Sequence, residues 1–394
     1  MNMQNQSSLP NWVLAAVPLV LLLGLVAAFL MLDPLRSFAG ANPPLEELSV
    51  QRVLFPEDGH IEMQVINGGP DPVTVAQLLV DDAYWAFEIE PSNTLGRLEQ
   101  ANISIEYPWV RDEPLPIVLL TSTGATFEAE VDVAVQAPTT DGHTLLAYGL
   151  LGIYVGVIPV GLGMLWYPFM RRVDRKWLNA ILALTVGLLV YLFIDTFLEA
   201  LEIAEEVPGA YQGVPVVVFG TLLSLGVLLA LGQRSDKGRS PLEIATLISI
   251  GIGLHNLGEG LAIGAAFASG AAALGSFLVV GFTLHNITEG VGIAAPLLRR
   301  EDSIRLTTFV WLTLLAGAPA ILGTWIGSLA FSPLVAIVFL SLGAGAILQV
   351  IWEVWLLLAN EATRQQQPVL SWLNFSGLAA GVLVMYLTAL IVKF

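Results

Sequence analysis

A twelve-residue motif occurs twice in the chain and carries side chains that commonly bind transition metals. It begins at Leu254 and again at Leu284, and seven of its twelve positions are identical in the two copies. Each copy contains His-Asn-x-x-Glu-Gly, so its histidine and glutamate are four residues apart, as His255 with Glu259 and His285 with Glu289. Residues at this spacing lie on one face of an α-helix, one turn apart. Each copy therefore places an imidazole and a carboxylate where both can reach one metal ion.

The two copies are expected to face each other near the middle of a membrane. They lie in apolar segments at 241–269 and 271–298, joined by a short turn near 268–275, so the two helices should be antiparallel neighbours. Carboxylates deep in a bilayer are costly and usually functional, and a divalent cation would offset two negative charges. Imidazole with carboxylate suits zinc, iron(II) or manganese. The alternative is a set of hydrogen bonds between His and Glu without any metal.

Other acidic residues extend this pattern along the expected membrane helices. Asp195 and Glu199 are again four residues apart, and Glu202 continues toward the outer end of the same segment. We interpret these three residues as an entrance path for cations, with a solvated helix end as the alternative. Glu353 lies toward the inner half of a later segment and is a candidate for the exit path, with a carboxylate near the interface as the alternative.

Hydropathy predicts the membrane helices that must hold these residues in position. Apolar runs of about 18 or more residues are typical of membrane-spanning helices. One such run covers 11–32, and eight more follow a polar stretch, at 144–170, 177–203, 214–233, 241–269, 271–298, 303–329, 333–360 and 370–392. Three parts are therefore expected: a membrane helix at 1–33, a polar domain at 42–142 and an eight-helix domain at 144–394.

The basic residues orient these helices, because cytoplasmic loops are enriched in Lys and Arg. They follow every second core segment, as Arg171, Arg172, Arg175, Lys176, Arg234, Lys237, Arg239, Arg299, Arg300, Arg305 and Arg364. The N-terminus is then inside, and the polar domain is extracytoplasmic. The first segment is interpreted as an uncleaved signal anchor, although Ala39-Gly40-Ala41 leaves a cleaved signal peptide as the alternative.

The polar domain is expected to be a small immunoglobulin-like β-sandwich. Apolar and polar residues alternate at 61–66, 103–107 and 127–133, and turn residues separate these runs. About 95 residues with roughly seven short strands fit such a sandwich. Of the 33 acidic residues, 19 lie between Asp33 and His143, against four of the 16 basic ones, so the net charge of −17 belongs mostly to this domain.

The composition excludes several classes of protein. Charged residues make up 12% of the chain, half of the roughly 25% that is typical of soluble domains. There is no cysteine, which excludes disulfides and thiolate metal sites. No strong basic patch is present, so nucleic acid is not an expected partner. The expected partners are a metal cation and the lipid bilayer, with a homodimer as a candidate assembly.

These features resemble the ZIP (Zrt/Irt-like) family of divalent metal transporters. The resemblance covers about 144–394, and the His-Asn-x-x-Glu-Gly of the fourth core helix is the hallmark of the family. The segment Phe193–Ala200 is similar to the family's F-L-H-x-x-P-E-A segment, with Asp195 in the position of the histidine and Leu198 in that of the proline. The segment from Gly343 to Glu353 resembles the family's glycine-rich seventh helix.

The resemblance implies an all-α, polytopic membrane protein with its eight core helices arranged 3+2+3. It implies a principal metal site made by His255, Glu259, His285 and Glu289. It also implies a second site, which would use Asn256 and Asn286, and transport toward the cytoplasm.

Two departures from the family pattern bear on these sites. The segment 314–320 has no carboxylate, and Asn286 is neutral where some members have an acid. Both departures favour one strong site. The loop 233–240, often rich in histidine in the family, has none here, which argues against metal sensing by that loop.

The expected function is transport of a divalent transition metal through the multi-pass cell membrane. Zinc is the first candidate, and iron(II), manganese and cadmium are the others. The chain is not expected to be an enzyme. The alternatives are an intramembrane metal-dependent hydrolase, since a glutamate beside zinc can serve as a base, and a membrane metal sensor that binds metal without flux.

Overall fold

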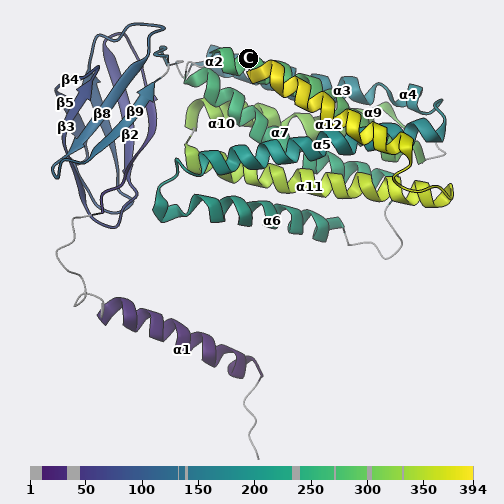
Figure 1. Ribbon diagram of the computed structural model, residues 1–394, viewed down its shortest axis with the longest axis horizontal. Helices are drawn as coiled ribbons and strands as arrows, with labels where there is room; N and C mark the ends of the chain where they lie inside the picture. The colour runs from purple at the N-terminus through teal and green to yellow at the C-terminus, as the bar shows by residue number, and fades with distance from the viewer. Residues whose placement is uncertain are drawn as a thin grey trace, which may run out of the picture. The chain divides into compact units, whose positions relative to one another are not determined.

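The computed structural model describes residues 11–32, 45–131, 133–137, 141–232, 240–269, 272–299, 304–330 and 332–393. They belong to two compact units, Met1–Leu45 and Glu46–Phe394. The first unit contains the expected N-terminal apolar helix, α1 (Asn11–Leu32). The second contains a β-domain and a helical body (Figure 1). The cleavage-site alternative at 39–41 and the loop at 233–239, with its three basic residues, lie outside the described residues, as does Arg300.

The β-domain consists of two antiparallel sheets. One has the strand order β1-β2-β7-β5 and the other the order β4-β3-β8-β9, with β6 beside β3. The first sheet comprises β1 (Leu48–Leu54), β2 (His60–Asn67), β7 (Gln100–Glu106) and β5 (Phe87–Glu90). The second comprises β4 (Ala83–Tyr84), β3 (Val73–Val80), β8 (Leu115–Thr121), β9 (Thr126–Val131) and β6 (Thr94–Leu95). The alternating runs expected at 61–66, 103–107 and 127–133 lie in strands as far as Ile66, Glu106 and Val131, and Asp132 lies outside the described residues.

The two sheets bury their apolar faces against each other. In β2 every second side chain is fully buried, including Ile61 and Met63, as expected for a strand with one face toward a core. These residues form one cluster with Leu78 of β3 and with Ile117 and Leu119 of β8. A small β-sandwich is therefore present, while its immunoglobulin-like classification stays a prediction.

The helical body is built from apolar helices of very different lengths. They are α2 (Gly142–Gly152), α3 (Ile158–Met164), α4 (Tyr167–Met170), α5 (Arg175–Ile203), α6 (Gly213–Gly232), α7 (Pro241–Ala268), α8 (Ala272–Ala294), α9 (Leu306–Gly317), α10 (Pro319–Ala330), α11 (Pro333–Arg364) and α12 (Trp372–Lys393). In the described residues, seven helical segments are long and apolar enough to cross a membrane, and the shorter apolar stretches Ala16–Phe29 and Trp372–Leu387 accompany them. The chain is thus a mostly helical, multi-pass membrane protein with a small β-domain.

Two segments that were expected to be continuous are interrupted. The segment at 144–170 contains a π-helical turn, η2 (Ile153–Val157), between α2 and α3. Pro159 follows this turn and has no backbone N–H to donate to the carbonyl of Val155 four residues earlier. The segment at 303–329 breaks between α9 and α10 immediately before Pro319, for the same reason. Hydropathy does not detect either break, because the residues on both sides are apolar.

Helix α7, which carries the first copy of the motif, is the most enclosed of the spanning segments. Of its most apolar stretch 72% is buried, against 61% or less in the other six segments. It packs along α10 and α11 and also contacts α8 and α9. A polar side chain on α7 is therefore held among helices on several sides, and the position of its functional atoms is set by packing.

One arginine of the β-domain contacts the end of α10. Arg52 donates from Nη1 to the carbonyl oxygen of Leu329 at 3.1 Å and from Nη2 to that of Ser328 at 3.2 Å. These carbonyls belong to the last turn of α10, where a positive charge interacts favourably with the helix dipole. Burial lowers the pKa of the Arg52 guanidinium from its ordinary value. Arg52 thus ties β1 to the helical body.

We expect Arg52→Ala to loosen the β-domain without unfolding it. The substitution leaves two helix-terminal carbonyls without their charged donor, while the sandwich core does not include this side chain. The expected result is faster cleavage of the β-domain from the purified protein in limited proteolysis. Arg97→Ala, which changes an exposed arginine of the same domain, is the control. Equal cleavage of the two variants would show that the Arg52 contact does not hold the domain.

Candidate metal site

The first copy of the motif sits on a helix whose start is well defined by its sequence. The Ser240 hydroxyl accepts a hydrogen bond from the backbone N–H of Glu243, and the Glu243 carboxylate accepts from the backbone N–H of Ser240. This capping box and Pro241 in the first turn fix where α7 begins. The helix then runs unbroken through both His255 and Glu259 to Ala268. The second copy lies in the same way within α8.

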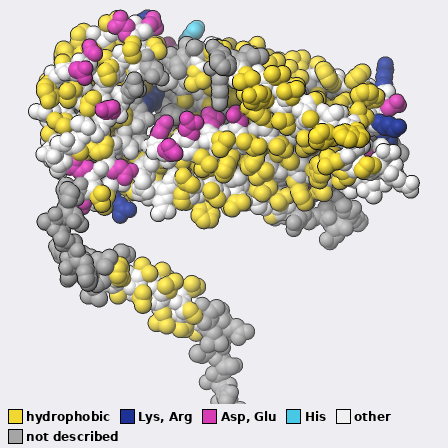
Figure 2. All heavy atoms as spheres, in the orientation of Figure 1, with side chains coloured by type: hydrophobic (Ala, Val, Ile, Leu, Met, Phe, Trp, Pro, Cys, Tyr) yellow, Lys and Arg dark blue, Asp and Glu magenta, His cyan; other side chains and the backbone are white. Residues whose placement is uncertain are grey.

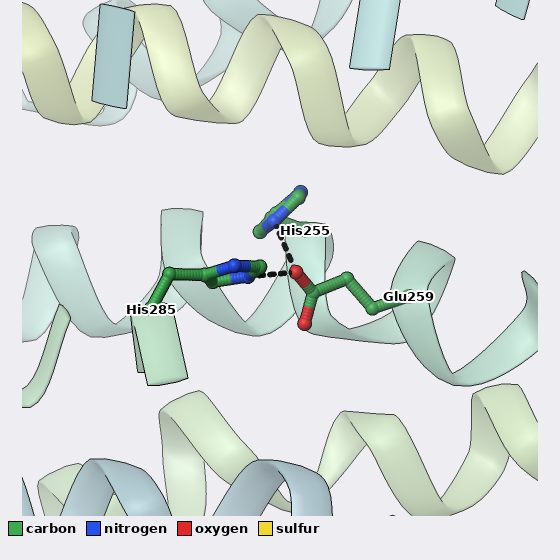
Figure 3. A group of neighbouring side chains, drawn as sticks. All are labelled: His255, Glu259 and His285. Carbon is green, nitrogen blue, oxygen red and sulfur yellow. Dashed lines mark hydrogen bonds and ion pairs between the residues drawn. The ribbon is translucent and has the colours of Figure 1, made fainter. Parts of the chain in front are cut away.

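Three of the four principal residues meet at one point (Figure 3). The His255 Nε2 lies 2.8 Å from Glu259 Oε1, and the His285 Nε2 contacts the same oxygen from α8. One potential ligand atom from each residue lies within 4.8 Å of the others. All three side chains are buried, with at most 6% of their surface exposed. Two imidazoles and one carboxylate converging in this way are a donor set for zinc, iron(II) or manganese.

The fourth principal residue, Glu289, lies outside this group but close to it. Glu289 is buried, one turn from His285 on α8, and interacts electrostatically with Glu259. Neither of its carboxylate oxygens accepts a hydrogen bond of ordinary length and angle, although the Asn256 side chain lies near the carboxylate. A buried carboxylate without a partner is costly, because its charge is removed from water without compensation. Hydrogen bonds between His and Glu account for Glu259 but leave Glu289 unexplained, whereas a bound cation would account for both.

The two motif asparagines hold the interrupted helices. Asn286 Nδ2 donates to the carbonyl oxygen of Val155 at 3.1 Å, which Pro159 leaves without its helical donor, and also to Glu259 Oε2 at 3.1 Å. Asn256 Nδ2 donates to the carbonyl oxygen of Ala316 at 3.0 Å, beside the break between α9 and α10.

The Asn286 amide thus satisfies the Val155 carbonyl that Pro159 leaves free, and the Asn256 amide ties α7 to the end of α9 beside the second break. The Oδ1 atoms of both asparagines are buried and have no hydrogen-bond partner. The expected ligand role of Asn256 and Asn286 therefore concerns their oxygens alone, and the structure adds a positioning role that sequence analysis missed. The sequence did contain signals for the helix breaks beside these asparagines, namely Pro159 and Pro319.

The candidate entrance residues are more exposed than the buried group. On α5, Asp195 and Glu202 are exposed and Glu199 is half-buried. Figure 2 shows acidic side chains gathered on the helical body near the β-domain. Beyond the end of α5, burial and the charge of Glu202 raise the pKa of Glu206 above its ordinary value. The structure thus places these acids in the last turns of α5 and just beyond them, and the described metal-binding group consists of other residues, His255, Glu259 and His285.

The candidate exit residue is enclosed by the helices. Glu353 on α11 is buried, and Gln349 one turn earlier donates to its Oε1 from Nε2 at 3.3 Å. Helix α11 also passes the first motif closely, because a Cβ atom at Gly343 would lie 3.3 Å from the Cα atom of His255. One helix therefore carries polar side chains from the His/Glu group toward its own C-terminal end. Gln349 was not predicted, and no motif marks it.

Comparisons with known proteins find similarity over the part of the chain that carries this site. Residues 232–389 match the family model described as ZIP Zinc transporter. Over 151 residues the chain is 30% identical to a protein described as zinc transporter ZupT from Nitratidesulfovibrio vulgaris, and the match covers 31% of this chain and 53% of that protein. The chain thus spans about half the length of this curated relative. The family match includes both copies of the motif but neither α5 nor the β-domain.

Proposed function

The chain belongs to the ZIP family, and on that premise we propose that it transports divalent transition-metal cations, with zinc as the first candidate, toward the cytoplasm. The observation that carries the proposal is the buried group of His255, Glu259 and His285 beside the unpaired carboxylate of Glu289. This set offers nitrogen and oxygen donors, and the ion would compensate charges that are otherwise expensive in a membrane. Membership of this family of transporters also argues against an enzyme.

We propose the following path for the ion. It arrives past Asp195, Glu199 and Glu202, exchanges water for the four principal residues, and leaves past Glu353. Asn256 and Asn286 orient the surrounding helices and present their free oxygens to the ion. Access to a fixed mid-membrane site would alternate between the two sides, as is typical of secondary transporters.

We place the protein in the cell membrane with its N-terminus inside and its β-domain outside. The proposed parts are the anchor at 1–33, the β-domain at 42–142 and the transport domain at 144–394. The alternation of basic loops supports this orientation. Protease digestion of intact spheroplasts tests this orientation, since the β-domain should be cleaved from the outer face.

A homodimer is the candidate assembly, and light scattering of the purified protein measures the oligomeric state.

Uptake into liposomes tests the function and ranks the metals. We expect purified protein to carry zinc into sealed vesicles, and unlabelled iron(II), manganese and cadmium to compete according to their affinity. Protein-free vesicles give the background rate. Saturable metal binding without uptake would favour the metal-sensor alternative, and the absence of both would overturn the proposal.

A further inference from the structure

A cavity with both polar and apolar lining lies at the end of the helical body where α5 begins and α11 ends. Its volume is about 250 Å³, and it is lined from α5 by Arg175, Asn179 and Leu182 and from α11 by Leu357 and Glu361, together with residues around α4 and η4 (Ala295–Arg299). By the proposed orientation this is the cytoplasmic end. Apart from Ala295, the last residue of the second motif copy, none of the lining residues belongs to the repeated motif, and the proposed path does not use them.

The cavity contains a buried carboxylate that is paired with a solvent-exposed arginine. Glu361 is 5% exposed, and its Oε1 accepts hydrogen bonds from Arg175 Nη1 at 2.7 Å and from Gln365 Nε2 at 3.1 Å. The Arg175 side chain, in contrast, is 72% exposed. A buried carboxylate requires a compensating cation. Here the compensating charge is carried by a long side chain that water reaches, so it can leave the carboxylate without itself being desolvated.

An unpaired oxygen lies in the same cavity. Asn179, one turn after Arg175 on α5, is 4% exposed, and its Oδ1 has no hydrogen-bond partner. Buried polar atoms are nearly always hydrogen-bonded, so an unpaired one calls for a ligand. Glu361 and Asn179 thus contribute two oxygen donors from two helices to one small cavity.

Helix α11 connects this cavity with the His/Glu group. Gln349 and Glu353 lie one turn apart on one face of the helix, Glu361 follows eight residues later within a third of a turn of them, and all three are buried. Gln349 lies against α7 close to the motif. Its Oε1 would be 3.2 Å from a Cβ atom placed on Gly251, one turn before His255. Polar side chains therefore mark α11 from the proposed metal site to the cavity.

We propose that Glu361 and Asn179 form an additional, inner site for the divalent cation, and that the Arg175 guanidinium occupies this site while no ion is in it. The proposal rests on the proposed transport function, because it assigns the site to an ion that leaves toward the cytoplasm. Carboxylate and amide oxygens bind zinc less strongly than imidazole does, so the ion passes from a tight site to a weaker one. When the ion has left, Arg175 returns to Glu361 and opposes the re-entry of cations.

The test counts the metal ions bound to the purified full-length protein. Equilibrium dialysis against Mn²⁺, an ion suited to oxygen donors, gives the number bound to the wild type. We expect Arg175→Gln to bind one Mn²⁺ more than the wild type, because the buried carboxylate has lost its tethered cation. The double variant Arg175→Gln/Glu361→Gln should return to the wild-type number. Adding Asn179→Leu to Arg175→Gln should lower the affinity for the additional ion by roughly tenfold, which is the scale of losing one supporting group.

Matched controls separate this proposal from the transport function. Arg172→Gln removes a neighbouring arginine that does not line the cavity, and it should bind the wild-type number of ions. If Arg175→Gln does not fold, Glu361→Gln, which leaves no buried charge, should slow Mn²⁺ uptake into liposomes while keeping the wild-type number of bound ions. An Arg175→Gln protein that folds but binds no additional ion, or a Glu361→Gln protein with wild-type uptake, would overturn the inner site. Failure of the wild type itself to carry metal would instead overturn the transport function.

Discussion

Glu259→Gln is expected to reduce metal uptake into liposomes by at least roughly 100-fold, the upper range for damage to groups that support a metal site. One oxygen of this carboxylate contacts both His255 and His285, and the other accepts a hydrogen bond from Asn286. Glu259 therefore joins α7 to α8 at the proposed site. Glutamine keeps the shape of the side chain but removes the negative charge and replaces one acceptor with a donor. Initial uptake rates measured with equal amounts of reconstituted protein give the effect.

Glu243→Gln is the matched control, because it makes the same chemical change on the same helix. Glu243 is exposed in the first turn of α7, where its carboxylate completes the capping box with Ser240. Glutamine also serves in a capping box, so α7 should begin at the same residue. This variant should keep wild-type uptake. Wild-type uptake by Glu259→Gln at full protein levels would show that the ion does not depend on this group.

The convergence of the His/Glu group could be predicted because it depends on short-range geometry. A spacing of four residues fixes His255 and Glu259 on one helix face, and the short connection after α7 makes α8 its neighbour. Burying a carboxylate in a membrane is costly and usually functional, and this second argument led to the same motif residues. The structure supports three of the four members as one group, whereas Glu289 lies just outside it. That difference concerns side-chain placement, which the spacing of residues alone does not determine.

The features that sequence analysis missed depend on contacts between distant parts of the chain. Asn286 donates to the carbonyl of Val155, which lies 131 residues earlier, and Arg175 pairs with Glu361 across 186 residues. Val155, Arg175 and Glu361 belong to no motif, and a single sequence contains no record of which residues meet in the fold. Pro159 was visible in the sequence, but its consequence, a free carbonyl of Val155 that Asn286 satisfies, appears only when the helices are packed.

Gly163→Ala is expected to destabilise the protein and weaken metal binding, although Gly163 touches none of the proposed ligands. In an open helix this change would stabilise by about 0.5–1 kcal/mol, because glycine costs more backbone entropy than alanine. At Gly163, however, α3 crosses α8, and an added Cβ would overlap the carbonyl oxygen of Ile287 and lie 2.9 Å from the Cα atom of Gly290. These are backbone atoms that cannot turn aside, so α8 must shift, and the cost should reach roughly 1–3 kcal/mol. Thermal unfolding in detergent and zinc binding by calorimetry measure the two effects.

Gly161→Ala on the same helix separates packing from helix propensity. A Cβ at Gly161 would meet only a methyl group of Thr313, at an ordinary 3.5 Å. The same substitution two residues earlier should therefore leave stability unchanged or raise it slightly, and zinc binding should be that of the wild type. The residues that α8 would displace include His285 and Glu289, which lie on either side of Ile287. If Gly163→Ala proved as stable as Gly161→Ala, or bound zinc equally well, close packing of α3 on α8 would not be what positions the second copy of the motif.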